Sequence, residues 1–386
     1  MIPATANQVM KADAAPTSTL EWVALLGRRD VPTDAVETYC EYLAEALSLH
    51  HIRLRCVRFP WEEQGWAAAF AGLQREFNST RPDLVLLQYT ALAWSRRGFS
   101  LGFLRVLRFL RRAKIRCGVV FHDAAPYEGA RLIDRLRQNS QQLVMRSAVR
   151  QAELSVMTLP KERTRWLPVV ASRCVSIPVG ANLPSPEASW KRKDSALPPA
   201  VAVFSITEGA TDEVQIIADA VRYASVQIGE LRLVVFGRGV ADFERLFRER
   251  LAGTAVQLSI IGVVDAHEIV RLLSDASVFL FVRGHISARR GSAIAGIACG
   301  LPVVARRGWE TASPITEAGV VLLPPDAGGE AFGAALVRVL SDREYAAELA
   351  ELSRKAFSRY FSWQVIAAQY VQTMRELESS RPSHAE

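Results

Sequence analysis

The sequence predicts an α/β protein made of two doubly wound parallel-sheet domains in tandem. Short apolar runs rich in β-branched residues alternate with longer segments of helical period, which is the pattern of a parallel sheet covered by helices on both faces. This alternation is interrupted once, by a polar, proline-rich segment near residue 190, and then restarts. The chain has 386 residues, of which 49% are apolar and 23% charged, a length and composition typical of two globular domains.

Six strands are predicted in the first domain, which we place at residues 1–183. Between the first two, residues 34–49 carry apolar side chains at spacings of three and four, the period of an amphipathic helix. The same period recurs at 103–114, where Arg105, Arg108 and Arg112 share one helical face. The predicted strands are the apolar runs at 22–26, 52–59, 84–89, 116–121, 154–159 and 174–178.

The second domain is predicted at residues 201–360, after a linker at 184–200. The linker contains Pro184, Pro186, Pro198 and Pro199, which no core strand would tolerate. The two sheets are expected to face each other across a cleft, because ligands of open parallel sheets bind outside the carboxyl ends of the strands. Strands are predicted at 201–206, 231–236, 256–261, 278–282, 302–305 and 320–323, and helices include 213–228, 242–251, 266–273 and 292–299.

A final helix is predicted at residues 361–386. Its apolar residues form one stripe, made of Trp363, Ile366, Tyr370, Met374 and Leu377. Because this helix follows a complete domain, we expect it to cross back and pack on the first one.

The chain shows no signal for secretion or membrane insertion. No apolar run approaches the roughly 18 to 20 residues of a membrane-spanning helix, and the first twenty residues lack the features of a signal peptide. Five cysteines occur singly, without the spacing of a metal site. We therefore expect a cytoplasmic protein with neither a disulfide framework nor structural zinc.

The net charge of +7 is unevenly distributed. Residues 1–190 hold 25 Lys and Arg against 17 Asp and Glu, whereas the remainder holds 22 against 23. Much of the excess lies between Arg96 and Arg116, a stretch without any acidic residue. Such a patch favours an anionic partner. Nucleic acid is disfavoured, because the basic residues alternate with aliphatic ones and no recognised nucleic-acid-binding motif is present.

The segment 278–305 carries the clearest candidate for an anion site. A buried strand leads to Arg289 and Arg290, and Gly291-Ser292 then opens a helix of small residues. Free N–H groups, the positive end of the helix dipole, the Ser292 hydroxyl and two arginines suit a phosphate. The alternative is a tightly packed helix preceded by solvated arginines, and we favour the anion site.

Three further strand ends carry candidate site residues. Gly237-Arg238-Gly239 could admit a phosphate close to the backbone, or could simply form a turn. His122-Asp123 suits hydrogen bonding or proton exchange, although a lone histidine is often only structural. In the loop at 27–34, Arg28 and Arg29 could face an anionic substrate, while Asp34 is more simply explained as a helix cap.

These residues together resemble the retaining glycosyltransferases of the GT-B fold, specifically the nucleotide-sugar-dependent family 4. The resemblance covers nearly the whole chain, and its most specific part is ACGLPVVA at 298–305. The other matching segments are His122-Asp123, IPVGAN at 177–182, Gly237-Arg238-Gly239 and Phe361-Ser362-Trp363.

The resemblance implies transfer of a hexosyl or related sugar from a nucleotide diphosphate sugar, with retention of configuration and without a metal or other cofactor. The second domain would hold the donor, through Gly237, Arg238, Gly239, Arg289, Arg290, Gly291 and Ser292. The first would hold a glycan or lipid-linked acceptor, with Arg28 and Arg29 near it. His122 would lie near the transferred sugar, with Asp123 beside it as a second catalytic candidate.

Two departures from the family pattern leave an alternative open. The paired glutamates of the family would align with Ser287 and Ala295, so neither carboxylate is present. The arginine and lysine that the family has after the first strand of the donor domain would fall within 205–212, which contains no arginine or lysine. A catalytically silent protein of the same fold, binding sugar nucleotide or serving as a subunit in glycan assembly, is therefore the second hypothesis. Sugar-nucleotide epimerases are a third.

The basic helix at 103–114 suggests a location for the protein. The simplest interpretation is a helix packed on its sheet with solvated arginines. As a further hypothesis, Arg105, Arg108 and Arg112 contact anionic lipid and hold the protein at the inner face of the membrane, each contributing on the order of 1 kcal/mol.

Overall fold

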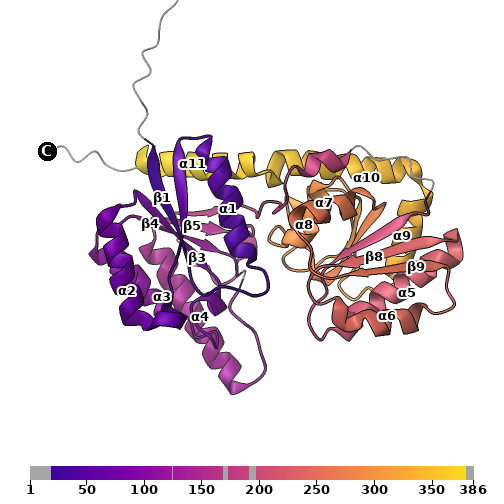
Figure 1. The fold of residues 1–386 in the computed structure, drawn as a ribbon, viewed down its shortest axis with the longest axis horizontal. Helices are drawn as coiled ribbons and strands as arrows, with labels where there is room; N and C mark the ends of the chain where they lie inside the picture. Colours follow the sequence, from indigo (N-terminus) through magenta and orange to yellow (C-terminus); the bar gives the residue numbers. More distant parts are fainter. Residues whose placement is uncertain (1–18, 124, 168–172, 191–196, 380–386) are drawn as a thin grey trace, which may run out of the picture.

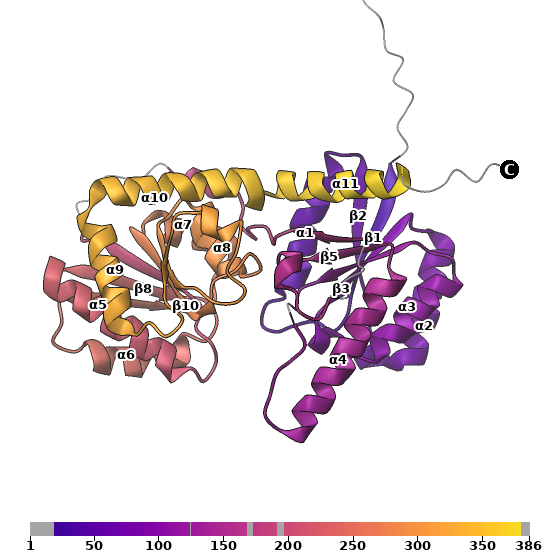
Figure 2. The same ribbon diagram turned by 180° about the vertical axis from the view of Figure 1, so that it is seen from behind.

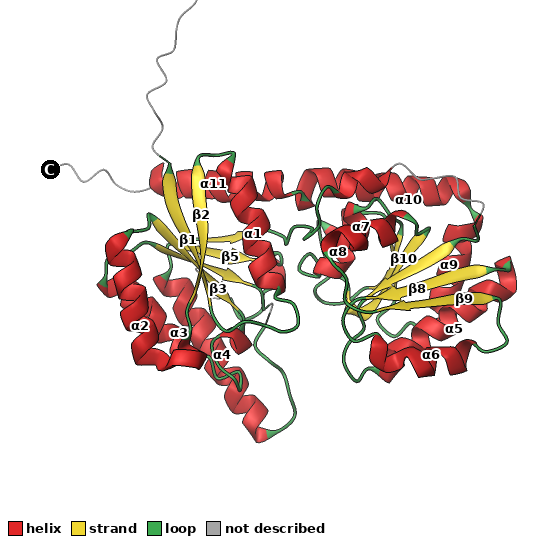
Figure 3. Cartoon of the chain, viewed as in Figure 1, coloured by secondary structure: helices red, strands yellow, loops and turns green. Residues whose placement is uncertain are grey.

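The computed structural model describes residues 19–123, 125–167, 173–190 and 197–379. Two α/β domains lie next to each other, and a long helical segment runs along both (Figure 1). Colouring by secondary structure shows a sheet inside each domain with helices on its faces (Figure 3). Two parallel-sheet domains were predicted, and the structure confirms them.

The first domain contains a six-stranded sheet in the order β2-β1-β3-β4-β5-β6, in which every neighbouring pair is parallel. Its helices are α1 (Ala35–Ser48), α2 (Trp61–Ser79), α3 (Gly102–Arg112) and α4 (Leu132–Gln151). Asp34 caps α1, accepting hydrogen bonds from the backbone N–H groups of Val36 and Glu37, so the capping interpretation is confirmed. The strands are β1 (Leu20–Leu26), β2 (Ile52–Arg58), β3 (Leu84–Tyr89), β4 (Cys117–Phe121), β5 (Leu154–Met157) and β6 (Cys174–Ser176).

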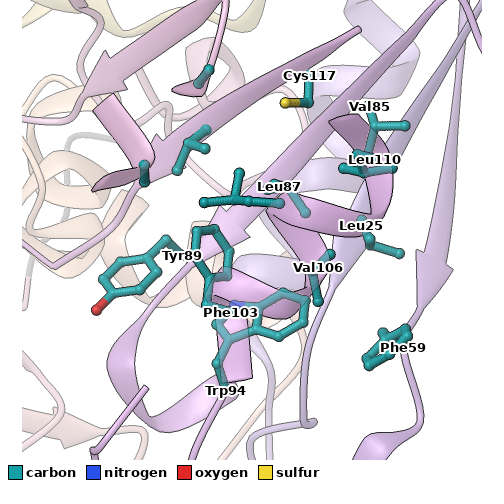
Figure 4. Packing of buried hydrophobic residues seen from close by; sticks show 14 of the residues in the cluster. Leu25, Phe59, Val85, Leu87, Tyr89, Trp94, Phe103, Val106, Leu110 and Cys117 are labelled. Carbon is teal, nitrogen blue, oxygen red and sulfur yellow. The ribbon is translucent and has the colours of Figure 1, made fainter. Parts of the chain in front are cut away.

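The core of this domain explains why its central strands are mostly apolar. All six residues of β3 are buried, because helices cover both faces of the sheet. Figure 4 shows Leu87 and Tyr89 of β3 beside Phe103 and Val106 of α3. These α3 residues occupy the inner face of the helix, which leaves Arg105, Arg108 and Arg112 exposed on the outer face.

The second domain repeats this architecture with the strand order β12-β11-β10-β7-β8-β9, again all parallel. Its strands are β7 (Ala200–Phe204), β8 (Leu231–Phe236), β9 (Val256–Ile261), β10 (Val278–His285), β11 (Val303–Arg306) and β12 (Val320–Leu323). Its helices are α5 (Thr211–Ile228), α6 (Glu244–Leu251), α7 (Ala266–Ser274), α8 (Gly291–Ala298), α9 (Gly329–Ser341) and α10 (Arg343–Ala356).

The strand β10 extends beyond its predicted end, and this matters for the site. The apolar run of β10 ends at Val282, but the strand continues through Arg283 to His285, which pairs with Arg306 of β11 after a shift in register. Backbone pairing does not need apolar side chains, so the hydrophobic pattern alone predicts a strand that ends too early. The extension places Arg283 on the strand, next to the N-terminus of α8.

The C-terminal helix crosses back to the first domain, as predicted. After the π-helical turn η6 (Phe357–Phe361), α11 (Trp363–Ser379) runs along the first domain (Figure 2). Tyr370 and Tyr39 of α1 share a buried hydroxyl–hydroxyl hydrogen bond of 2.8 Å, and Trp363 stacks on Tyr42. Four residues of the predicted stripe, Trp363, Ile366, Tyr370 and Met374, belong to the buried cluster that joins α11 to this domain, and the partly buried Leu377 packs against it.

Part of the predicted linker packs against the second domain. Residues Pro186–Trp190 form the 3-10 turn η3, in which the Ser189 hydroxyl donates to the Cys299 carbonyl at 3.0 Å. The indole of Trp190 donates to the Ala298 carbonyl at 2.8 Å. Residues 191–196 of the linker lie outside the described part of the chain.

Candidate functional site

The loops at the carboxyl ends of the two sheets contact each other. Arg238, after β8, donates to the Asp30 carboxylate at 3.0 Å and to the Thr33 carbonyl at 2.6 Å, both in the loop after β1. The N–H of Val179 donates to the Ala288 carbonyl at 3.0 Å. Ligands of such sheets bind where the strand order reverses, here between β1 and β3 and between β7 and β10. The candidate site is therefore built from both domains.

The N-terminus of α8 carries a cation that no carboxylate neutralises directly. Arg290 is the N-cap of this helix, and its buried Nε has no hydrogen-bond partner among the described residues. Burial, reinforced by the positive charges of Arg289 and Arg283, lowers the pKa of Arg290 to about 10. Gly291 is exposed and Ser292 half-buried, so their backbone N–H groups lie at the accessible start of the helix.

Arg283 is a second such cation, and the sequence analysis did not identify it. Its buried Nε also lacks a partner among the described residues, and burial lowers the pKa of this guanidinium too. Glu213, an acid whose charge acts on Arg283, already accepts hydrogen bonds from the backbone N–H and the hydroxyl of Thr207. Partly buried guanidinium groups without partners are costly, so this arrangement favours an anionic ligand. The only sequence signal was an arginine directly after an apolar strand.

The other two predicted donor-site arginines are engaged within the protein. Arg289 forms a bidentate pair with Glu310, with Nε–Oε2 at 2.9 Å and Nη2–Oε1 at 2.6 Å. Arg238 bonds to Asp30 and Thr33 across the domain boundary. The sequence predicted both as donor-binding residues but did not indicate these ion pairs, because the partners lie far away along the chain.

Gly237 and Gly239 are explained by local geometry. Both have positive φ, of 98° and 77°, which favours glycine. A Cβ on Gly239 would lie 2.4 Å from the carbonyl oxygen of Ile206. The two glycines thus form the turn that was the simpler alternative and bring Arg238 against the end of β7. Their contact with a donor stays a prediction.

His122 follows β4 and is held as a neutral ring. Its Nε2 lies 2.8 Å from Oε1 of Gln88, and the Gln88 amide donates to the Leu86 carbonyl at 3.2 Å. This network assigns the proton to Nε2 and leaves Nδ1 as an acceptor. Burial lowers the pKa of His122 to about 4. The ring can therefore accept a hydrogen bond from a hydroxyl group at neutral pH.

Asp123 connects two loops of the first domain. Its Oδ2 accepts a hydrogen bond of 2.6 Å from the backbone N–H of Ala91, in the loop after β3. Burial raises the pKa of Asp123, while this hydrogen bond and the positive charge of Arg289 act in the opposite direction. Arg289 belongs to the second domain, so a positive charge of one domain acts on a carboxyl group of the other.

A pocket of 220 Å³ opens in the first domain between the loops after β1 and β3. Its lining brings together Arg28, Arg29, Gln88 and Asp123. Both arginines have carboxylate partners, since Arg28 lies 3.4 Å from Glu62 and Arg29 lies 2.7 Å from Glu37. The structure thus places the predicted acceptor-side residues around one pocket, with their charges already paired.

The basic surface of α3 begins beside aromatic side chains of α2. Arg105 lies over the rings of Trp66 and Phe70, at 5.1 and 5.5 Å. The neighbouring α4 begins with Leu132 and Ile133, whose exposed fractions are 78% and 47%. Figures 1 and 2 both show this end of α4 extending beyond the sheet. Among the residues that the structure describes, no helix is long and apolar enough to cross a membrane.

Potential metal ligands are not clustered in the described ranges: no group of three or more His, Cys, Asp or Glu side chains there is arranged to hold a metal ion. The expectation of a reaction without a metal or other cofactor stays a prediction.

Comparisons with known proteins agree with this architecture. Residues 200–342 match the model of a family described as "Glycosyl transferases group 1". Sucrose-phosphate synthase from Thermosynechococcus elongatus has a similar structure, with a TM-score of 0.68 and 18% identity over 94% of this chain and 100% of that one. No curated protein sequence matches the chain.

Two further solved structures are similar at low identity. HepE from Anabaena, in complex with UDP and glucose, has a TM-score of 0.63 and 15% identity over 92% of this chain and 100% of that one. A putative UDP-N-acetylglucosamine 2-epimerase from Listeria monocytogenes has a TM-score of 0.60 and 11% identity over 95% and 98%. These comparisons confirm the GT-B fold and the resemblance to GT-B glycosyltransferases.

Proposed function

We propose that this protein is a glycosyltransferase that takes a sugar from a nucleotide diphosphate sugar and transfers it with retention of configuration. One observation carries the proposal: Arg290 at the N-terminus of α8 and Arg283, whose charge acts on it, are partly buried, and the Nε of each has no partner within the described part of the chain. A diphosphate there would neutralise both guanidinium groups and accept hydrogen bonds from the free N–H groups of the helix. The family match of residues 200–342 and the UDP in the HepE structure support the same ligand class.

In this reaction the bond between the anomeric carbon and the diphosphate oxygen breaks, and its electron pair leaves with the phosphate. The acceptor oxygen bonds to the same face of that carbon, and its proton passes to the departing phosphate oxygen. Arg283, Arg290 and the α8 N–H groups stabilise the charge that develops on the leaving group. Nδ1 of His122 accepts a hydrogen bond from a sugar hydroxyl, and the pocket at Asp123 receives the acceptor.

The test combines Arg290→Ala with Gly291→Val. A side chain at 291 would meet no atom within 4 Å, so the fold should tolerate it while the approach to the helix N-terminus is blocked. We expect loss of nucleoside diphosphate binding and of transfer. Arg245→Ala, on the exposed surface of α6, is the control and should leave both unchanged. Full activity in the double variant would refute the site.

A catalytically silent binding protein is the second candidate, favoured by Ser287 and Ala295 at the positions of the family glutamates. Calorimetric titration with UDP and GDP, followed by turnover assays with a panel of sugar nucleotides, separates the two. Binding without transfer or hydrolysis would support the silent protein. Formation of an epimer without any acceptor would instead indicate an epimerase.

We also propose that the acceptor is a glycan or a lipid-linked sugar and that the protein acts at the inner face of a membrane. The exposed arginines of α3 and the exposed leucines at the start of α4 provide charge and apolar surface for anionic lipid. Vesicles containing phosphatidylglycerol should bind the protein at low salt, and replacing Arg105, Arg108 and Arg112 by Gln should weaken binding. No binding of the wild type would refute this location.

A further inference from the structure

Position 287 is a serine, but the carboxylate of Glu310 lies directly beside it. The Ser287 hydroxyl donates to Oε2 of Glu310 at 2.9 Å, and both residues are buried. The two positions are 23 residues apart in sequence, so the arrangement depends on the turn after β11 folding against the loop after β10.

That turn is attached to the loop by specific contacts. The Thr311 hydroxyl donates to the Ile286 carbonyl at 2.7 Å and accepts from the N–H of Gly308 at 2.9 Å. A Cβ on Gly308 would lie 2.0 Å from the ring of His285, so only glycine permits this approach. The position of Glu310 is therefore determined by backbone packing.

Glu310 in turn determines the direction of Arg289. Its oxygens accept from Nε and Nη2 of Arg289, which leaves Nη1 to donate to a ligand. The Glu310 side chain is only 6% exposed, whereas that of Arg289 is 22% exposed, so the accessible group of the pair is the guanidinium. Burial alone would raise the pKa of Glu310, but the hydrogen bonds and charge of Arg289 outweigh it and lower the pKa.

The pair lies where the two domains meet. The positive charge of Arg289 acts to lower the pKa of Asp123 in the first domain. Trp309, next to Glu310, lies under the guanidinium of Arg165 from the first domain, at 5.7 Å. On the other side, Arg290 is the adjacent cation at the N-terminus of α8. Arg289 is thus adjacent in sequence to Arg290 of the proposed diphosphate site, and its charge acts on Asp123.

We propose that Glu310 is a positioning residue of the donor site, which with Ser287 holds Arg289 so that its free Nη1 contacts the sugar-bearing phosphate of the donor. This inference rests on the proposed function, because it needs a nucleotide sugar at α8. Arg290 and the helix N–H groups hold the diphosphate, and Arg289, through Glu310, orients its sugar end. Misplacing such a group costs up to about 100-fold in rate.

The test exchanges the two side chains, in the variant Ser287→Glu with Glu310→Ser. The exchange conserves the total charge and the total side-chain volume. It places the carboxylate at position 287 and the hydroxyl at position 310, so that the same two groups can form their hydrogen bond. Glu310→Ser alone should lower kcat by roughly 100-fold, and the exchange should restore it to within about tenfold of the wild type. Glu310→Gln, the mildest change, should lower kcat and weaken the binding of UDP or GDP, which keep the sugar-bearing phosphate, while leaving the Kd for UMP or GMP unchanged. Glu351→Gln, an ion-paired glutamate of α10, is the control.

The measured quantities are kcat, the donor KM, and the ratio of Kd for the nucleoside diphosphate to Kd for the nucleoside monophosphate, which lacks the sugar-bearing phosphate. A structural role alone would not change that ratio in Glu310→Gln, so an unchanged ratio and kcat would overturn the inference. A folded exchange variant no more active than Glu310→Ser would also overturn it.

Failure of the proposed function gives a different result. A wild type that binds nucleotide sugars without transferring them refutes the function, and the Kd ratio still tests Glu310. A wild type that binds no nucleoside diphosphate refutes both.

Discussion

Two neighbouring arginines are expected to affect stability in opposite directions. The buried Nε of Arg290 has no partner among the residues that the structure describes, and the pKa of this group falls from 12.5 to about 10. That difference corresponds to roughly 3 kcal/mol against the charged form. Arg290→Met removes the charge and keeps the buried stem, so we expect the free energy of unfolding to rise by about 1–2 kcal/mol, allowing for partial exposure.

Arg289→Met should have the opposite effect. It leaves the carboxylate of Glu310, whose residue is only 5% exposed, without its bidentate partner. Removing one partner of a buried pair costs about 3–5 kcal/mol. The loss should diminish on acidification, because Glu310 can then become protonated and neutral.

Thermal unfolding with and without UDP or GDP measures both variants. Relative to the wild type, Arg290→Met should melt a few degrees higher without ligand, and ligand should no longer raise its Tm. Arg289→Met should melt lower. Arg245→Met, on the exposed face of α6, should change stability by less than about 0.5 kcal/mol. If Arg290→Met melts below the wild type and is still stabilised by nucleotide, Arg290 is a structural residue and the anion-site argument fails.

Three further predictions concern other parts of the molecule. His122 has a folded pKa of about 4 against 6.5 in the unfolded chain, so the unfolded state binds more protons between these values. Stability should therefore fall by roughly 2–3 kcal/mol from pH 7 to pH 4, and denaturant titrations should show a smaller fall in His122→Gln. Tyr370→Phe leaves the buried hydroxyl of Tyr39 unpaired and should lower the free energy of unfolding by about 1–3 kcal/mol, whereas an unchanged value would mean that α11 does not need this bond. Arg238 and Asp30 are both exposed, so a double-mutant cycle with alanine should give a coupling of about 0.2–1 kcal/mol; zero coupling would show that the contact does not stabilise the domain arrangement.

Much of the fold could be predicted from local pattern. The strand β3 was predicted with its exact limits, because a run of apolar residues buried on both faces begins and ends with its strand. The α11 stripe also identified the buried face of that helix correctly. The extension of β10 through Arg283 was missed, because hydrogen bonding continued where the apolar pattern stopped.

The candidate site was predictable only in part. The position of Arg290 at the start of α8 followed from a Gly-Ser helix opening after a strand, a local signal. Arg238 and Arg289 stay predicted donor-binding residues, but their ion pairs were not foreseen, because Asp30 and Glu310 reach them from distant parts of the sequence. Arg283 and Glu310 carry no local motif, and only their surroundings distinguish them from other charged residues.

By itself, the sequence determined the two parallel-sheet domains, the final helix and the edges of the sheets where ligands bind, because hydrophobic period and chain order specify these features. Only the tertiary structure decided which arginines are already neutralised and which still lack a partner. The physical reason is that a charge is governed by whatever lies within a few ångströms of it. For Arg289 that neighbour is a carboxylate 21 residues away, and for Arg290 it is further positive charge.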